Sequence, residues 1–390
     1  MKILTWLSRR RFPYEPLISV EISRRRLLAN LAAFQKIAPG KGVATVLKSN
    51  AYGHGLFEIA SILEKEKNIP FFIVDSYFEA IALRSRGIHT ALLVIGFTRP
   101  ETIISSHLKN VAFTVTSLET LKNILGKSRG KNIHIHLKID TGMHRQGVLE
   151  SEVDAAINLI KNAQGIVLDG ICSHLCDADN NDPAFTQGQI KMWNALVQKC
   201  TAAFPGLSYI HLANTDGHRY DGTIEANVSR LGVGLYGLSE NTALANDMDL
   251  VPVLEMKTIL TSIKPLQKGE SVGYSNTFTA ARDMTIATIP VGYFEGVDRR
   301  LSSATSTSGG GIILVGPDRI PCPIIGRVSM NITSIDISNV PGAHIGMTAV
   351  AVSNRSSDEN SIVSIAKKCA TISYEIVVHI PAHLKRKIVD

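Results

Sequence analysis

The chain has 390 residues, of which 45% are hydrophobic and 19% are charged, and its formal net charge is +7. This length predicts two domains, and the composition is that of a soluble globular enzyme, which excludes a disordered or fibrous chain. Much of the basic excess lies near the ends, in "SRRRF", "SRRR" and "HLKRK". No nucleic-acid-binding motif accompanies it, so we expect no nucleic-acid partner.

The five cysteines are an odd number scattered through a long chain, which argues against a disulfide framework and is typical of a reducing cytoplasm. Cys172 and Cys176 flank His174, but no second cluster accompanies them, so we expect no metal site. At the N-terminus the apolar residues precede the arginines, the reverse of the order in a secretory signal, and no segment reaches a membrane-spanning length. We therefore expect a cytoplasmic protein without a membrane partner.

In the first 240 residues, short apolar runs alternate with helical patterns such as "SRRRLLANLAAFQKIA". Eight strand-like runs separated by helices predict a TIM-like (β/α)8 barrel, which we place at residues 18–250. The predicted strands are "VATVLK", "FFIVDS", "ALLVIG", "VAFTV", "HIHLKID", "LDGICSHL", "YIHLAN" and "GVGLYG".

After about residue 255 the helical periodicity fades, and β-rich pieces separated by glycine and proline follow one another. These pieces predict a smaller, mostly antiparallel β domain at residues 251–390. Residues 1–17 form a basic N-terminal extension, and "SSATSTSGGG" has the composition of a flexible loop.

The stretch "ATVLKSNAYGHG" ends an apolar run on Lys48 and continues into a turn bounded by glycines. A solvated lysine is the usual interpretation of a single lysine. In a barrel, however, a buried strand delivers its last side chains to the edge where active sites form. A lysine there loses water, its pKa falls, and the free amine becomes a nucleophile towards carbonyl groups. The stretch therefore suggests that Lys48 forms a Schiff base.

Polar side chains also follow the other predicted barrel strands. Each one alone is more often a satisfied buried group or a surface ion pair, but their common position at one edge of a barrel favours a site. Glycines next to the last strand would let backbone N–H groups approach a phosphate. Tyr52 follows the same strand as Lys48, and Arg230 precedes the last predicted run, "LGVGLYG". The side chains that end or follow the other strands are Lys138, Asp140, Arg145, His174, Asn214 and Thr215.

Several motifs occur in the order and spacing of a known family. They are "VLKSNAYGHG", "HLKIDTGMHRQGV", "SHLCDAD", "LANT", "SRLGVGLYG", "VGYSNTFTA", "IPVGYFEGVDRRL" and "IIGRVSMN". From about residue 18 to the C-terminus, the chain resembles alanine racemase, a pyridoxal 5'-phosphate (PLP) enzyme with a barrel followed by a β domain. The resemblance implies racemisation of L- and D-alanine, which supplies D-alanine for peptidoglycan, and a homodimer with shared active sites.

The resemblance also implies roles for individual residues. Lys48 would hold PLP through a Schiff base and act as the base on one face of the substrate's α-carbon. Tyr274, from the second subunit, would be the base on the opposite face. Arg230 would contact the ring nitrogen of PLP, and His174 would link Arg230 to Tyr274.

The remaining site residues follow from the same resemblance. Tyr52, Thr215, Gly232 and Val233 resemble the phosphate contacts, and we place Asn214 with them in the cofactor site. Arg145 and Met330 match positions that hold the substrate carboxylate. Lys138 matches a lysine that the family often carries as a carbamate. The entrance is predicted to be lined by Asp179, Arg299 and Arg327.

The chain departs from the family pattern at two positions. Asn331 replaces an aspartate after Met330, and Ala382 stands where an ungapped alignment expects a tyrosine that touches the phosphate and narrows the entrance; Tyr374 is the alternative partner. A racemase of broader specificity, for example one that accepts serine, is therefore an alternative function. A barrel-type PLP decarboxylase would present an acidic residue in place of Arg230. A non-catalytic PLP-binding homeostasis protein would lack the β domain.

Overall fold

The structure is a computed structural model that describes residues 14–127, 132–303 and 310–390. The chain divides into two compact units. Residues 24–253, together with Asp390, form the barrel unit. Residues 254–389, together with the described residues up to Ser23, form the β unit. Most of the N-terminal extension and most of the "SSATSTSGGG" loop lie outside the described residues.

The barrel unit contains eight parallel strands in the order β8-β7-β6-β5-β4-β3-β2-β9. Backbone N–H groups of Asn227 and Arg230 donate to Ile210 and Ala213 across the remaining gap, so the barrel is nearly closed. The predicted (β/α)8 barrel is thereby confirmed. The strands are β2 (Gly42–Val46), β3 (Phe72–Val74), β4 (Leu92–Val94), β5 (Val111–Val115), β6 (Ile133–Lys138), β7 (Ile166–Cys172), β8 (Tyr209–His211) and β9 (Val228–Leu231).

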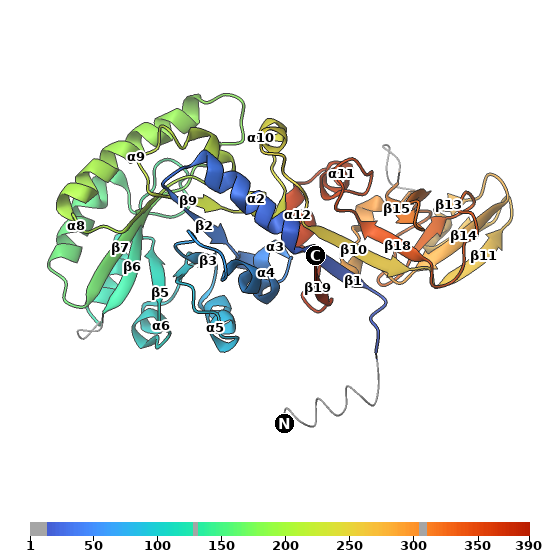
Figure 1. Ribbon diagram of the computed structural model, residues 1–390, viewed down its shortest axis with the longest axis horizontal. Helices are drawn as coiled ribbons and strands as arrows, with labels where there is room; N and C mark the ends of the chain where they lie inside the picture. The colour runs from blue at the N-terminus through green and yellow to red at the C-terminus, as the bar shows by residue number, and fades with distance from the viewer. Residues whose placement is uncertain (1–13, 128–131, 304–309) are drawn as a thin grey trace, which may run out of the picture. The chain divides into compact units, whose positions relative to one another are not determined.

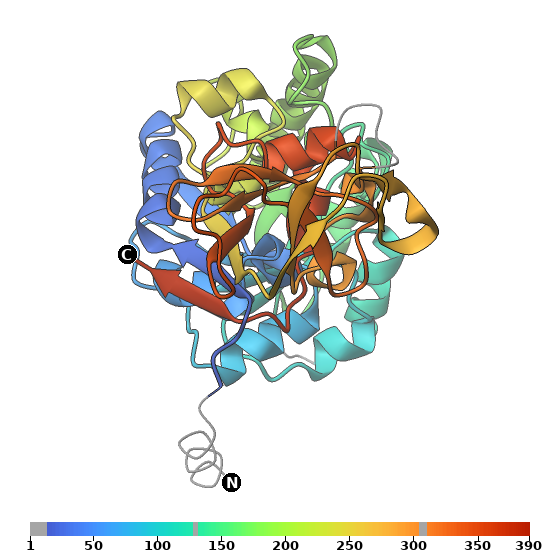
Figure 2. The same ribbon diagram turned by 90° about the vertical axis from the view of Figure 1, so that its right-hand side faces the viewer.

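Helices surround these strands, as Figures 1 and 2 show for the blue to green part of the chain. Their apolar stripes face the strands; in α7, for example, Leu121 and Ile124 are buried. Serine side chains cap α5 and α7 by accepting backbone N–H bonds. The helices are α2 (Arg24–Ile37), α4 (Leu56–Leu63), α5 (Tyr77–Ser85), α6 (Pro100–Ser105), α7 (Leu118–Leu125), α8 (Val153–Lys161), α9 (Ala184–Ala203) and α10 (Thr242–Asp247).

The eighth strand differs from the prediction. We expected it over "GVGLYG", but the strand is β9, just before that run, and residues Val233–Tyr236 form a 3-10 turn, η3. Gly237 has φ +79°, and a Cβ there would lie 1.9 Å from the carbonyl oxygen of Val251. Glycines allow this tight turn, and a left-handed glycine ends it. Arg230 therefore lies within the last strand, not before it.

The described residues of the β unit form three sheets. The largest has the order β16-β15-β18-β10-β1-β19, and all its neighbours are antiparallel except β1 and β19. The second sheet has the order β11-β14-β17, and β12 and β13 form a two-stranded hairpin. The strands are β1 (Ser19–Ser23), β10 (Leu254–Ile259), β11 (Ser262–Leu266), β12 (Ser271–Val272), β13 (Phe278–Thr279), β14 (Met284–Ile289), β15 (Ile312–Val315), β16 (Ile320–Pro323), β17 (Thr333–Asp336), β18 (Thr348–Val352) and β19 (Arg386–Val389).

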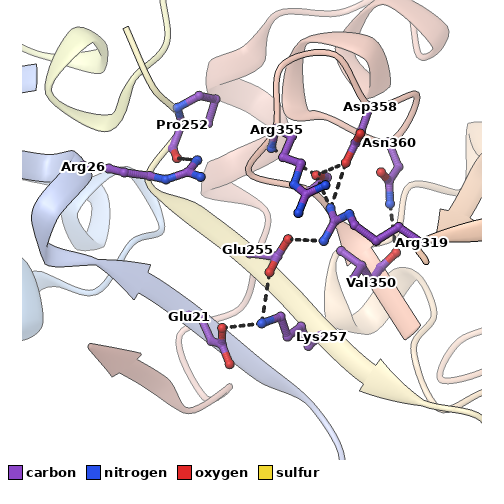
Figure 3. A network of polar contacts seen from close by, with 11 residues as sticks. Glu21, Arg26, Pro252, Glu255, Lys257, Arg319, Val350, Arg355, Asp358 and Asn360 are labelled. Atoms are coloured by element: carbon purple, nitrogen blue, oxygen red, sulfur yellow. Dashed lines mark hydrogen bonds and ion pairs between the residues drawn. The ribbon is translucent and has the colours of Figure 1, made fainter. Parts of the chain in front are cut away.

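Strand β1 pairs with β10 and β19, so residues 19–23, which we expected to begin the barrel, lie in a sheet of the β unit. A polar network supports this pairing (Figure 3). Lys257 contacts Glu21 on β1 at 2.6 Å and Glu255 on β10 at 3.1 Å. Arg319 continues the network to Glu255 and Asp358. The alternation of apolar and polar residues in β1 is short, and it does not indicate which sheet the strand joins.

Two short helices of the β unit were not predicted, α11 (Ile362–Lys368) and α12 (Ser373–Val378). The Ser361 side chain caps α11 by accepting from the Ser364 N–H. Over the described residues, no helix is long and apolar enough to cross a membrane. The same residues contain no cluster of three or more histidine, cysteine or acidic side chains suited to a metal ion.

Candidate active site

Lys48 begins an unusual turn immediately after strand β2. The strand ends at Val46, and Lys48 opens the short helix α3 (Lys48–Tyr52). Ser49, Asn50, Ala51 and Tyr52 all have φ between 50° and 56°, so this turn is left-handed. Residues other than glycine rarely adopt this conformation, which costs about 1–2 kcal/mol each. Such strain concentrates at functional sites.

Contacts from neighbouring segments hold this turn. The Glu79 carboxylate accepts the N–H of Asn50 at 3.1 Å and the N–H of Asp75 at 2.9 Å, and so joins the turn to the end of β3. The Asn50 side chain accepts the N–H of Leu56 at 2.8 Å. These bonds fix the positions of Lys48 and Tyr52.

A small polar cradle lies where the turns after β2, β8 and β9 meet. The Thr215 hydroxyl accepts the N–H groups of Gly232 at 3.2 Å and Gly234 at 3.1 Å, which leaves its own proton to donate. A Cβ at position 232 would lie 3.2 Å from the Tyr52 hydroxyl and 3.5 Å from Thr215 Oγ1. Glycine therefore keeps this space open. Hydroxyl donors beside a glycine-rich turn suit a phosphate.

The Arg230 side chain is only 8% exposed, and its guanidinium makes several hydrogen bonds inside the barrel unit. Its Nη1 donates to Nδ1 and the carbonyl oxygen of His211, and its Nη2 donates to the carbonyl oxygens of Ser173 and Leu212. Nη2 also contacts His174 Nδ1 at 3.0 Å. Among the described residues, none accepts a hydrogen bond from Nε–H. All the protein acceptors are neutral.

Behind Arg230 lie two histidines that sequence reasoning missed, His211 and His136. A guanidinium can only donate, so His211 Nδ1 must accept, and the proton of His211 is on Nε2. This Nε2 donates to His136 Nδ1 at 2.8 Å. Gly170 makes room, since a Cβ there would lie 2.9 Å from His136 Nδ1. A signal was available: His136 lies two residues before Lys138 and shares its strand face.

The electrostatics of the site are dominated by burial among cations. Burial lowers the pKa of His174, and the charges of Arg230, Lys138, Arg145 and Lys48 lower it further. Burial is also the main reason why the pKa of His136 falls to about 3 and the pKa of His211 falls well below its usual value. All three histidines are therefore neutral at neutral pH.

Burial and the charge of Arg230 also shift the pKa values of Lys138 and Tyr52. Burial lowers the pKa of Lys138, and Arg230 and Arg145 contribute to the shift. Burial raises the pKa of Tyr52, and Arg230 opposes that change in part. The barrel unit thus brings Lys48, Tyr52, Lys138, His174 and Arg230 into one electrostatic neighbourhood.

The other predicted barrel residues lie in the surrounding loops. Arg145 is exposed in the loop after β6, where Asp140 accepts the N–H groups of Gly142 and His144. Asn214 accepts the Gly217 N–H and donates to the Leu175 carbonyl, so it shapes the turn next to Thr215. Asp179 accepts a bond from Asn241 at its backbone oxygen.

In the β unit, Tyr274 opens a 3-10 turn (η4, Tyr274–Asn276) between β12 and β13 and is 70% exposed. Gly273 before it has φ +79° and Ser275 after it has φ 61°. Under the hairpin, Leu266, Val272, Ala280, Ile286 and Ile325 form a buried apolar cluster. The hairpin therefore presents a large aromatic side chain on a well-packed base.

Met330 is 55% exposed and lies in a second turn of the β unit. Arg299 lies at the start of the 3-10 turn η6 (Arg299–Leu301) and is exposed, whereas Arg327 is partly buried. Gly273 lies next to the backbone of Arg327, since a Cβ at Gly273 would lie 3.5 Å from the Arg327 backbone nitrogen.

Ala382 is exposed in the segment between α12 and β19, and Tyr374 is partly buried on α12. Next to Ala382, the His383 ring stacks on Phe294 with their centroids 5.0 Å apart. The aromatic surface at this point therefore comes from Phe294 and His383.

Two sequence-profile matches together cover most of the chain. The sequence profile described as "Alanine racemase, N-terminal domain" matches residues 22–240, and the profile described as "Alanine racemase, C-terminal domain" matches residues 253–388. The chain belongs to the alanine racemase family. It is therefore an isomerase of the racemase type, and the relationship identified from its motifs is confirmed.

Individual relatives support the assignment over nearly the whole length. An alanine racemase of Sorangium cellulosum is 32% identical over 87% of this chain and 90% of that protein. An alanine racemase of Lactobacillus acidophilus is 32% identical over 93% of this chain and 94% of that protein. The solved alanine racemase of Clostridium difficile 630 superposes with a TM-score of 0.87 at 28% identity, covering 96% of both chains.

One structural relative has a different substrate in its name. The histidine racemase of Leuconostoc mesenteroides has a TM-score of 0.85 and 25% identity, and the match covers 97% of this chain and 99% of that chain. The same fold therefore carries more than one substrate specificity.

Proposed function

We propose that this racemase interconverts L- and D-alanine with PLP, which the barrel unit binds covalently through Lys48. The observation that carries the proposal is Arg230, a buried guanidinium held by histidines and carbonyl groups with its Nε–H left over. A donor without a protein acceptor suits the ring nitrogen of PLP, which is an acceptor when unprotonated. The cradle of Tyr52, Thr215 and Gly232, completed by Val233 and Asn214, suits the phosphate.

When bound, PLP withdraws electrons from the substrate's α-carbon and makes its proton removable. Arg230 cannot protonate the ring nitrogen as a carboxylic acid would, so it moderates this withdrawal. A PLP decarboxylase of similar architecture would be expected to place a carboxylate here. The chemistry of Arg230 therefore favours racemisation over decarboxylation.

Two bases on opposite faces of the α-carbon would move the proton. The Lys48 amine takes or returns it on one face, and the Tyr274 oxygen does so on the other. Because Arg230 donates towards His174 Nδ1 at 3.0 Å, the neutral His174 carries its proton on Nε2. This N–H can donate to a phenolate. Such support helps a tyrosine, whose ordinary pKa is about 10, to act as a base at neutral pH.

We assign Tyr274 to a second copy of the chain, so that each active site of a homodimer takes residues from both subunits. The 70% exposure of Tyr274 supports this assignment, since an exposed aromatic side chain on a packed hairpin is available to a partner. Arg145 and Met330 would contact the substrate carboxylate. Asp179, Arg299 and Arg327 would line the entrance.

Lys138 has the environment that carbamylation needs. Its lowered pKa increases the fraction of neutral amine, which can attack CO2; a nitrogen–carbon bond forms and one proton leaves to solvent. The resulting carbamate is an anion beside Arg145 and Arg230. It would neutralise part of the positive charge and orient Arg145 towards the substrate.

A racemase of broader specificity is the second candidate. Ala382 favours it, because an exposed alanine offers no hydroxyl and little bulk where the family pattern has a tyrosine.

If the protein is an alanine racemase, as proposed first, the D-alanine that it forms would serve peptidoglycan synthesis.

The test uses the purified protein in deuterated water with L-alanine and, separately, L-serine. We expect loss of optical activity together with exchange of the α-proton, fastest with alanine. Borohydride should fix PLP to wild-type protein and to the exposed-lysine control Lys65→Ala, but Lys48→Ala should neither retain it nor turn over. Covalent trapping in Lys48→Ala would remove Lys48 from the mechanism. Faster racemisation of serine than of alanine would support the second candidate.

A further inference from the structure

The turn that carries Met330 is joined to a neighbouring turn of the β unit by backbone bonds. Tyr293 and Phe294 donate their N–H groups to the carbonyl oxygens of Ser329 and Met330 at 3.0 and 2.9 Å. Gly292 allows this approach, since a Cβ there would lie 2.2 Å from the Ser329 oxygen. The two turns, residues 292–297 and 329–332, therefore form one unit, which we call the twin turn.

A side-chain pair closes the twin turn. Glu295 is only 6% exposed, and its Oε2 accepts the N–H of Gly292 at 2.9 Å. Its other oxygen, Oε1, accepts from the Asn331 side-chain amide at 2.6 Å. A buried carboxylate needs donors for both oxygens. Asn331 supplies one of them from the turn that carries Met330.

This contact shows why an amide suits position 331 in this chain. An aspartate there would place a second carboxylate against the buried Glu295, where the two charges would repel and one donor would be lost. An asparagine has nearly the same shape and donates. Asn331 therefore provides a donor at the point where Glu295 needs one.

We infer that Glu295 and Asn331 are positioning residues of this racemase, and that their hydrogen bond holds the Met330 backbone in the geometry that receives the substrate carboxylate. The inference rests on the proposed function, because Met330 is the proposed carboxylate contact. Neither residue touches the reacting atoms. Loss of the pair should therefore affect substrate binding more than the chemical step.

The kinetic test uses the holoenzyme and four variants. Asn331→Ala and Asn331→Asp should raise KM for alanine by roughly tenfold or more, with a smaller change in kcat, because small misplacements of binding groups cost this much. The double variant Glu295→Gln/Asn331→Asp should restore KM, since the new amide can accept from Gly292 and donate to the new carboxylate. Asn339→Asp, which adds the same charge at an exposed turn of the β unit, should leave KM unchanged.

Two outcomes would overturn the inference. One is an unchanged KM in Asn331→Ala, which is neutral and so excludes a mere charge effect. The other is a failure of the double variant to recover although it folds with the wild-type Tm. A readout independent of activity is amide hydrogen exchange of residues 292–297 and 329–332. Exchange should accelerate in Asn331→Ala and return towards wild type in the double variant, and it would still do so if alanine proved not to be the substrate.

Discussion

At the scale of single residues, the site depends on keeping buried histidines neutral beside a buried arginine. A histidine nitrogen can accept from Arg230 only when the ring is neutral, and burial lowers the pKa of His211 and His174 so that both can do so. His136 then accepts from His211 and completes the chain. The orientation of the guanidinium, and so of its Nε–H, follows from the tautomers of these rings.

The buried histidines predict how stability depends on pH. The folded pKa of His136, about 3, lies below its unfolded value near 6.5, so the unfolded state binds more protons between these limits. Stability is therefore fully present above about pH 6.5 and falls as the pH decreases, by up to ~1.4 kcal/mol per pH unit for each such histidine. In His136→Asn, whose side-chain oxygen can still accept from His211, this slope should be shallower.

Urea unfolding of wild type and His136→Asn at several pH values from 7 to 4 measures the effect. His344→Asn, which removes an exposed histidine of the β unit, is the control and should keep the wild-type slope. Equal slopes in wild type and His136→Asn would show that His136 is not held neutral.

At the scale of elements, the left-handed turn after β2 is the clearest departure from regular structure. Four successive residues other than glycine adopt positive φ, and Glu79 at the start of α5 (Tyr77–Ser85) accepts N–H bonds from this turn and from Asp75. Hydrogen bonds to Glu79, from the βα unit of β3 and α5, thus offset the backbone strain of this turn. Lys48 and Tyr52, at the two ends of the turn, depend on it for their positions.

Glu79→Gln tests this dependence. A glutamine side chain has only one acceptor oxygen, so one of the two backbone N–H groups loses its partner, at a cost of about 1–3 kcal/mol. We expect a lower urea midpoint and faster loss of PLP on dialysis, followed by the visible absorbance of the cofactor. Glu66→Gln, an exposed site, is the matched control. Wild-type PLP retention in Glu79→Gln would mean that the turn holds its shape without this carboxylate.

At the scale of the whole molecule, the residues that we propose for catalysis are divided between the two units of the chain. The barrel unit carries Lys48, His174 and Arg230, while the β unit carries Tyr274 and Met330. If Tyr274 comes from the partner subunit, neither subunit alone holds a complete set of bases. The oligomeric state then controls activity directly.

Mixing two inactive variants tests the shared site. Lys48→Ala and Tyr274→Phe should each racemise alanine poorly. After subunit exchange, a mixed dimer contains one site with both an intact lysine and an intact tyrosine. Random mixing of a symmetric dimer should restore about a quarter of wild-type activity. Two differently tagged variants, co-purified to prove exchange, provide the control. Absence of recovery in the proven mixed dimer would assign both bases to one subunit. Racemisation by Tyr274→Phe alone at close to the wild-type rate would instead make Tyr293 the next candidate for the second base.

The family and the repeating architecture could be predicted from the sequence alone. Hydrophobic runs and helical spacing are local properties, so the barrel was predictable, and the run "VAFTV" coincides with β5 (Val111–Val115). Polar residues that follow successive parallel strands must share one barrel edge. Lys48, Lys138 and His174 could therefore be grouped from their positions along the chain, whereas Arg230 was expected before the last strand and lies within it.

Only the tertiary structure decided which side chains meet and in what state. Arg230 contacts His211, 19 residues away, and His174, 56 residues away, through the nearly closed barrel. The left-handed turn at Lys48 depends on Glu79, and strand β1 finds its partners more than 200 residues along the chain in β10 and β19. Such contacts arise when distant segments pack together. Local propensity carries no information about them, and the tautomers and pKa values that follow depend on burial that only the packed structure creates.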